Sequence, residues 1–187
     1  EGDGVGEGMV AIDGGCYSQS DVDVLQDIVD LNENLNGLQS LEIGVQAWSS
    51  GRLIALTLGD WALTTLPESI GNLSGLEYLS LASNELTSLP ESIGNLSDLE
   101  FLALSHNQLT SLPESIGNLS SLWELRLDDN KFASLPESMC SLPNNCDIDV
   151  DNNFRPTYKV TSDKKKKPES KTEAKKDLPK KEDKGKK

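Results

Sequence analysis

The strongest constraint on the fold is an internal repeat. Four prolines, Pro67, Pro90, Pro113 and Pro136, are each separated by 23 residues, and similar text surrounds them: LTTLPESIGNLSG, LTSLPESIGNLSD, LTSLPESIGNLSS and FASLPESMCSLPN. Periods of this size are typical of a solenoid, in which each unit buries its apolar side only against its neighbours. The sequence therefore predicts a stack of similar coils.

The aligned units read L-x-x-L-x-L-x-x-N-x-L-x-x-L-P-x-x-I-G-N-L-x-x. They start at Leu53, Leu76, Leu99 and Leu122, and a truncated fifth unit starts at Asn145. In each unit two apolar residues two positions apart predict a short strand whose alternate residues point inward. These pairs are Leu56-Leu58, Leu79-Leu81, Leu102-Leu104, Leu125-Leu127 and Ile148-Val150. Each coil should add one strand to a parallel sheet, about 4.8 Å from the last.

This pattern resembles the leucine-rich-repeat family, specifically the 23-residue class with LPxxIGNLxxLxxLxLxxNxL units, over about residues 53–154. Similar text occurs in bacterial and algal repeat proteins, in plant intracellular Ras-group-related proteins and in animal Ras-pathway scaffolds. The resemblance implies an α/β solenoid: a right-handed coil with a parallel concave β-sheet and short helical or 3-10 segments on the convex side. Because this family is a scaffold for many ligands, the resemblance does not identify the partner.

One asparagine column is expected to be structural. In the family this residue is buried, and its amide satisfies backbone groups of adjoining coils, which would otherwise cost about 1–3 kcal/mol each. The column contains Asn84, Asn107, Asn130 and Asn153, and the first coil carries Trp61 at this position.

The segments that flank the repeats read as an N-terminal cap and two solvated ends. Residues 20–35 predict an amphipathic helix that covers the open end of the solenoid, within a cap at 16–52 that Leu41, Ile43, Val45 and Trp48 complete. The string LEIGVQAWSSGRL resembles the N-terminal flank of some bacterial surface repeat proteins. Residues 1–15 are expected to be a flexible Gly-rich leader, and residues 161–187 a disordered Lys-rich tail after a solenoid at 53–160.

The formal net charge of −14 divides into two blocks. From Asp163 onward 12 lysines face 6 acids, so residues 1–162 carry a net charge of −20. The acidic body argues against nucleic acid as the main ligand and favours a basic protein or peptide, with the chain's own tail as one candidate for self-association. No run approaches the roughly 20 apolar residues that span a bilayer.

Three cysteines bear on the compartment. A disulfide between Cys140 and Cys146 is the favoured interpretation and would imply an oxidising environment, while two free thiols are the alternative. Cys16 would then be left over. The cysteine pair and the N-terminal flank favour an extracellular or cell-surface location, and the plant and animal relatives leave a cytoplasmic one open.

The candidate binding site follows from variable positions. The second and third repeats are identical at 17 of 23 positions, and five of the six differences lie in or just after the strand. Outward strand positions form the concave face, on which this family usually binds partners. Exposed aromatic residues with charged neighbours favour an interface, although rings that merely cover the sheet are the alternative. The predicted site contains Tyr78, Phe101, Trp123, His106, Arg126, Glu100, Glu124, Asp128 and Asp129.

Other signals are weaker. The start of a calcium loop, Asp147 to Asn152, lacks the turn glycine and the final glutamate, so no metal is expected. Three N-L-S acceptor sequences, at Asn72, Asn95 and Asn118, belong to the repeat's own turn, and their glycosylation stays open. No catalytic constellation or cofactor motif is present. The sequence favours a non-enzymatic recognition module; the alternative is a structural, self-assembling surface protein that uses the solenoid ends and contacts between the acidic body and the basic tail.

Overall fold

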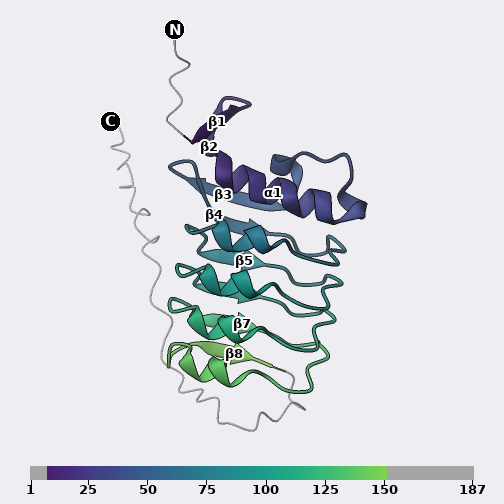
Figure 1. Ribbon diagram of the computed structural model, residues 1–187, viewed down its shortest axis with the longest axis vertical. Coiled ribbons are helices and arrows are strands. Elements are labelled where there is room, and N and C mark those ends of the chain that lie inside the picture. Colours follow the sequence, from purple (N-terminus) through teal and green to yellow (C-terminus); the bar gives the residue numbers. More distant parts are fainter. Residues whose placement is uncertain (1–7, 151–187) are drawn as a thin grey trace, which may run out of the picture.

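The computed structural model describes residues 8–150. One sheet runs along the whole stack of coils, with six strands in the order β3-β4-β5-β6-β7-β8 (Figure 1). Its strands are β3 (Val45–Ser49), β4 (Arg52–Thr57), β5 (Tyr78–Ser80), β6 (Phe101–Ala103), β7 (Glu124–Arg126) and β8 (Asp147–Asp149). Strands β4 to β8 pair in parallel, one per coil, which confirms the predicted solenoid.

Short 3-10 helices form the convex wall of the coils. They are η3 (Glu68–Asn72), η4 (Glu91–Asn95), η5 (Glu114–Asn118) and η6 (Glu137–Ser141). Each follows one of the four repeat prolines, whose ring fixes the backbone φ near the value that such a turn needs, as at Pro67 with φ −72°. The convex 3-10 segments that the resemblance implied are therefore present.

The core lies between the sheet and the convex helices. Strand register aligns Leu56, Leu79, Leu102 and Leu125, which are all fully buried. Isoleucines from the opposite wall, such as Ile93, are fully buried against the same cluster. Because burying one such side chain contributes about 1.5–3 kcal/mol, most of the stability comes from this repeated apolar interior.

Glycines on the convex side allow neighbouring coils to approach closely. A Cβ atom at Gly71, Gly94 or Gly117 would lie 2.4, 2.3 or 2.3 Å from the carbonyl oxygen of a serine in the next coil. No real Cβ contact is that short, so these positions accept only glycine without movement of the backbone. In the fourth unit the equivalent position is Cys140, which is exposed.

An N-terminal cap covers the first coil, and it begins earlier than the sequence predicted. Strands β1 (Met9–Ile12) and β2 (Gly15–Ser18) form an antiparallel hairpin, where residues 1–15 were expected to be a flexible leader. Asp13 and Gly14 join them, both with positive φ (50° and 81°). An Asp-Gly pair suits the two-residue hairpin turn that needs this conformation, and this local signal outweighs the glycine-rich composition.

Helix α1 (Gln19–Leu31) lies across the end of the stack, where it contacts β2 and η3 (Figure 1). It is shorter than the predicted helix at 20–35, because Asn32 leaves the helical conformation (φ −118°, ψ 104°) and Glu33–Leu35 forms the separate 3-10 turn η1. The buried Asn32 amide donates to the carbonyl oxygens of Ile28, at 2.8 Å, and Thr65, at 3.2 Å. Its departure from the helix therefore ties the cap to the first coil.

The short 3-10 turn η2 (Ser40–Glu42) links this region to β3. Strand β3 then pairs antiparallel with β4 through a hairpin, so the cap closes the N-terminal edge of the parallel sheet. Of the four residues expected to complete the cap, Ile43 is fully buried, and Leu41 and Trp48 pack partly buried against the core. Val45 differs: it lies on the outer face of β3 and is 72% exposed.

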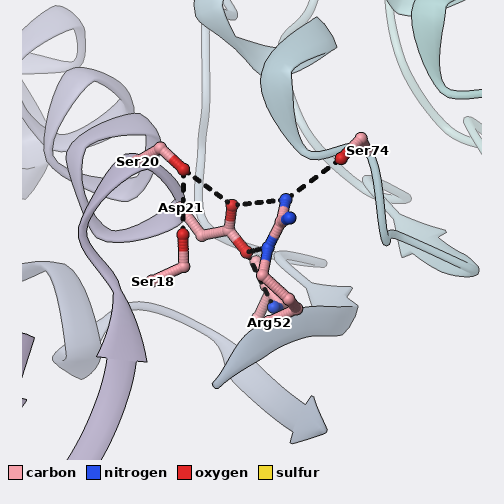
Figure 2. A network of polar contacts seen from close by, with 6 residues as sticks. Ser18, Ser20, Asp21, Arg52 and Ser74 are labelled. Atoms are coloured by element: carbon pink, nitrogen blue, oxygen red, sulfur yellow. Dashed lines mark hydrogen bonds and ion pairs between the residues drawn. The ribbon is translucent and has the colours of Figure 1, made fainter. Parts of the chain in front are cut away.

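Figure 2 shows a second link between the cap and the first coil, an ion pair of α1 with β4. The carboxylate of Asp21 is fully buried and accepts from Arg52 Nε at 2.8 Å, Arg52 Nη2 at 3.0 Å and the backbone N–H of Leu53 at 2.9 Å. The hydrogen bond to Asp21 raises the pKa of Arg52. A bidentate pair of this kind fixes both distance and direction between the two elements.

Several expectations lie outside the described residues: Asn153, residues 151–160 of the predicted solenoid and the Lys-rich tail. Within the described part of the chain, no helix is long and apolar enough to cross a membrane.

The glycine column gives a stability test. We expect Gly94→Ala to lower the free energy of unfolding by about 1–3 kcal/mol, the usual cost of overpacking, because the new methyl group meets the Ser115 carbonyl. Chemical denaturation measures this. Gly75→Ala is the control: its nearest neighbour would be 3.6 Å away, an ordinary contact, so stability should hardly change. Equal effects of the two substitutions would contradict the close-approach argument.

The ion pair gives a second test. Arg52→Met should lower the free energy of unfolding by about 2–3 kcal/mol, somewhat less than for a fully buried pair because Arg52 is 40% exposed. The control is Arg126→Met, which removes an exposed ion pair worth at most about 1 kcal/mol. If thermal or chemical unfolding showed a larger loss of stability in Arg126→Met than in Arg52→Met, the buried Asp21 carboxylate would not need Arg52 as its partner.

Candidate functional site

Asparagine amides that are buried at Asn84 and Asn107 and partly buried at Asn130 fix the point where each strand ends, and so position the side chains of the concave face. Asn107 Nδ2 donates to the carbonyl oxygens of Leu81 at 2.9 Å and Leu104 at 3.0 Å, and its Oδ1 accepts from Leu86 N at 3.1 Å. Asn84 and Asn130 make the equivalent bonds one coil before and one coil after. Each amide thus bridges two adjoining coils.

The residue before each position of the asparagine column, including Trp61 in the first coil, is left-handed. Asp60, Ser83, His106 and Asp129 have φ values of 62°, 57°, 55° and 53°. This turn directs the chain away from the sheet, and the four side chains form one column along the edge of the concave face. Because the register repeats every 23 residues, His106 and Asp129 are direct neighbours on adjacent coils.

Three aromatic rings lie across the middle of the concave face. Tyr78 and Phe101 occupy paired positions on β5 and β6, and their rings stack with centroids 4.4 Å apart and planes 2° apart. Trp123, just before β7, lies 6.2 Å from Phe101 at 51°. Phe101 is only 7% exposed, whereas Tyr78 is 39% exposed. The stack therefore presents Tyr78 to solvent over a supporting ring.

Arg126 completes this aromatic cluster. Its guanidinium carbon lies 5.2 Å from the centroid of Phe101, within the range of a cation–π contact. Its Nε donates to Glu124 Oε1 at 2.7 Å, and this hydrogen bond raises the pKa of Arg126. Since Arg126 is exposed, the ion pair contributes little stability, but it orients the guanidinium over the ring.

A hollow of about 310 Å³ lies between the aromatic cluster and the edge column. Its lining combines small side chains on its floor with an aromatic wall and charged groups at the rim. The lining residues are Tyr78, Ser80, Ala82, Phe101, Ala103, Ser105, His106, Arg126, Asp128 and Asp149. The small residues Ser80, Ala82 and Ala103 make the hollow possible because they leave space that larger side chains would fill.

Polar contacts at the rim join three potential ligand groups. His106 Nδ1 lies 3.0 Å from Asp129 Oδ2, and Ser105 Oγ donates to Asp128 Oδ1. One donor atom each from His106, Asp128 and Asp129 lies within 4.8 Å of the others. This arrangement is the one group of at least three histidine, cysteine or acidic side chains in residues 8–150 that could hold a metal ion.

Charge and polarity change along the concave face. At the N-terminal end the paired positions of β3 and β4 carry Val45, Ala47, Ala55 and Thr57, which are apolar or small. At the C-terminal end Asp147 and Asp149 of β8 are exposed. The aromatic cluster lies between a neutral half and an acidic half.

The structure brings most of the predicted site residues together, with one exception. Tyr78, Phe101, Arg126, His106 and Asp128 all line the hollow. Trp123, Glu124 and Asp129 adjoin it through Phe101, Arg126 and His106. Glu100 is exposed just before β6 and does not line the hollow. Ser80, Ala82 and Asp149 belong to the lining but were not selected from the sequence, because small or single acidic residues carry no signal of their own.

The favoured disulfide between Cys140 and Cys146 is not formed. Both are free thiols: Cys140 is exposed on η6, whereas Cys146 is buried in the core beside β8. Burial, with smaller contributions from Asp147 and Glu124, raises the pKa of this thiol to about 12. Cys16, in β2, is also free and exposed.

The repeated part of the chain matches a known protein family. A family model described as a leucine-rich repeat region matches residues 56–153, which is more than half of the chain. A search of curated proteins finds no match.

Solved structures that resemble the chain come from bacteria and plants. The leucine-rich-repeat protein LIC12759 of Leptospira interrogans is 48% identical over 48% of this chain and 24% of its own, with a TM-score of 0.46. The plant peptide hormone receptor RGFR1, solved in complex with RGF2, is 35% identical over 46% of this chain and 15% of its own, with a TM-score of 0.41. An internalin, InlF, of Listeria monocytogenes is 27% identical over 55% of this chain and 29% of its own, with a TM-score of 0.43. The chain thus spans less than a third of each of these proteins.

Proposed function

This chain belongs to the leucine-rich-repeat family, and we propose that it is a non-enzymatic recognition module that binds a protein or peptide partner on its concave face. The observation that carries the proposal is the stack of Tyr78 on Phe101, flanked by Trp123 and Arg126 and open to a hollow beside it.

The aromatic cluster has the properties of a binding hot spot. Tyrosine, tryptophan and arginine are the residues most enriched where a few side chains carry most of the binding energy. Here the rings are held before any partner arrives, because Phe101 is sandwiched between its neighbours and cannot rotate freely. A partner would therefore lose less conformational entropy on binding than it would on a surface of mobile side chains.

Charge favours a basic partner. Asp128 and Asp149 line the hollow, and Asp147 is exposed beside them, while Arg126, the cation in this lining, is already bound to Glu124. A lysine- or arginine-containing segment would complement this end of the face, with its apolar part over Tyr78. The lysine-rich residues 163–187 of this chain, or of a second copy, have that chemistry.

A catalytic role has less support. The only histidine, His106, is bound to Asp129, and its hollow is lined by no cysteine. Cys146 is buried, and its raised pKa keeps the thiol protonated and a poor nucleophile at neutral pH. The family itself is generally non-enzymatic. We place the recognition at the cell surface, on the strength of the N-terminal flank.

The alternative, a polymer built by stacking solenoid ends, is disfavoured by Cys140. This residue occupies the column in which Gly71, Gly94 and Gly117 let the next coil approach. A further coil stacked in the same way would meet the Cys140 side chain. Self-association through the acidic face and the basic tail does not use this contact and is tested separately below.

The proposed site predicts the effect of removing its exposed rings. Tyr78→Ala with Trp123→Ala should weaken binding to a partner captured on the immobilised chain by about 2 kcal/mol or more, roughly thirtyfold, as for hot-spot residues. Titration calorimetry or surface plasmon resonance measures this. Tyr17→Ala is the control, since it removes a ring that packs on Trp48 in the N-terminal cap. Unchanged affinity in the double variant would place the binding site elsewhere.

Light scattering distinguishes recognition from self-assembly. A recognition module should stay monomeric as the concentration rises at moderate salt. Assembly through the tail should instead give larger particles at low salt that dissociate at high salt and disappear when residues 163–187 are deleted. Salt-independent polymers in the deleted chain would contradict both descriptions of the concave face.

A further inference from the structure

We infer that His106, Asp128 and Asp129 form a binding site for a divalent transition-metal ion at the rim of the concave face. The donor atoms of these three side chains lie within 4.8 Å of one another. This inference does not rest on the proposed function, because the ion would bind the chain alone.

The repeat itself brings the three groups together. His106 and Asp129 are 23 residues apart and occupy the same left-handed position on adjacent coils, so their side chains leave the backbone in the same direction. His106 Nδ1 already faces Asp129 Oδ2 at 3.0 Å. Asp128 precedes Asp129 and has one carboxylate oxygen bound by Ser105, which holds that side chain in place and leaves the second oxygen for an ion.

The donor set selects the class of metal. One imidazole nitrogen and two carboxylates suit Zn²⁺, Co²⁺ or Ni²⁺, whereas Ca²⁺ and Mg²⁺ prefer oxygen ligands throughout. Around a tetrahedral ion with metal–ligand bonds of about 2.0–2.2 Å the donor atoms lie about 3.3–3.6 Å apart, so side-chain rotation must bring the most distant pair closer by about 1 Å. Exposed side chains such as His106 and Asp129 can make these rotations.

The hollow supplies a second, independent observation. His106 and Asp128 line it together with Asp149, so the cluster opens onto a space of about 310 Å³ that also carries a third carboxylate. Three protein ligands leave at least one coordination position for water or for a group of a bound molecule.

Metal titration of the full chain tests the inference. The exposed thiols Cys16 and Cys140 are first alkylated, because thiolates would compete for the ion. Calorimetry with Zn²⁺ should then show one saturable site, and Co²⁺ should give visible absorption bands. Since His106 is the only histidine in the chain, its imidazole NMR signals should shift with the same saturation curve.

Variants identify the ligands. His106→Ala and Asp129→Asn should each lower Zn²⁺ affinity by at least about tenfold, since even residues that only support metal ligands cost that much. Asp60→Asn is the matched control: it changes the left-handed aspartate of the first coil and should leave affinity within about twofold of the unmodified chain. Circular dichroism checks that the variants are folded. Absence of saturable binding, or equal affinity in His106→Ala, would overturn the inference whether or not a partner binds the concave face.

Discussion

Close approach of the backbone between neighbouring coils is the constraint on which the rest of the structure depends. On the convex side it is permitted by glycines such as Gly94, whose missing side chain leaves room for the Ser115 carbonyl. At the end of each strand it is enforced by asparagines such as Asn107, whose amide bonds to two coils at once. Burial of apolar side chains supplies the free energy of folding, but the glycine and asparagine columns determine the distance between neighbouring coils.

That spacing explains the character of the concave face. Parallel strands with constant register place equivalent side chains beside each other at about 4.8 Å, which is close to the separation of stacked rings. Tyr78 and Phe101 stack for this reason, and His106 meets Asp129 for the same reason. Function in such a molecule is therefore determined by columns of residues, and a change at one position acts through its neighbours one coil away.

The sequence predicted the repeated part of the fold well because every unit repeats the same evidence. Strand positions, convex turns and inward leucines follow from the period and from residue chemistry alone. The cap was predicted less well because it occurs once. The strand at Met9–Ile12 depends on a single Asp-Gly turn, and the early end of α1 depends on Asn32, whose amide also bonds to Thr65, 33 residues away. Asp21 and Arg52 gave no local sign that they would pair across 31 residues.

The candidate site was predictable in part for a related reason. Aligning the repeats identified Tyr78, Phe101 and Arg126, but it treated Phe101 as exposed, and that ring is buried. The hollow could not be predicted, since it consists of space left by Ser80, Ala82 and Ala103. Small residues of this kind form no recognisable sequence motif.

Cys140, which replaces the convex glycine in the fourth unit, also affects how the number of coils in this protein could change. Duplication of one whole internal unit would insert a coil between two others of the same kind, and both ends would keep the neighbours they already have. A coil packed against Cys140 would instead meet a side chain where the internal units have glycine. The molecule is thus able to lengthen from within, and each inserted coil would widen the concave face by one strand.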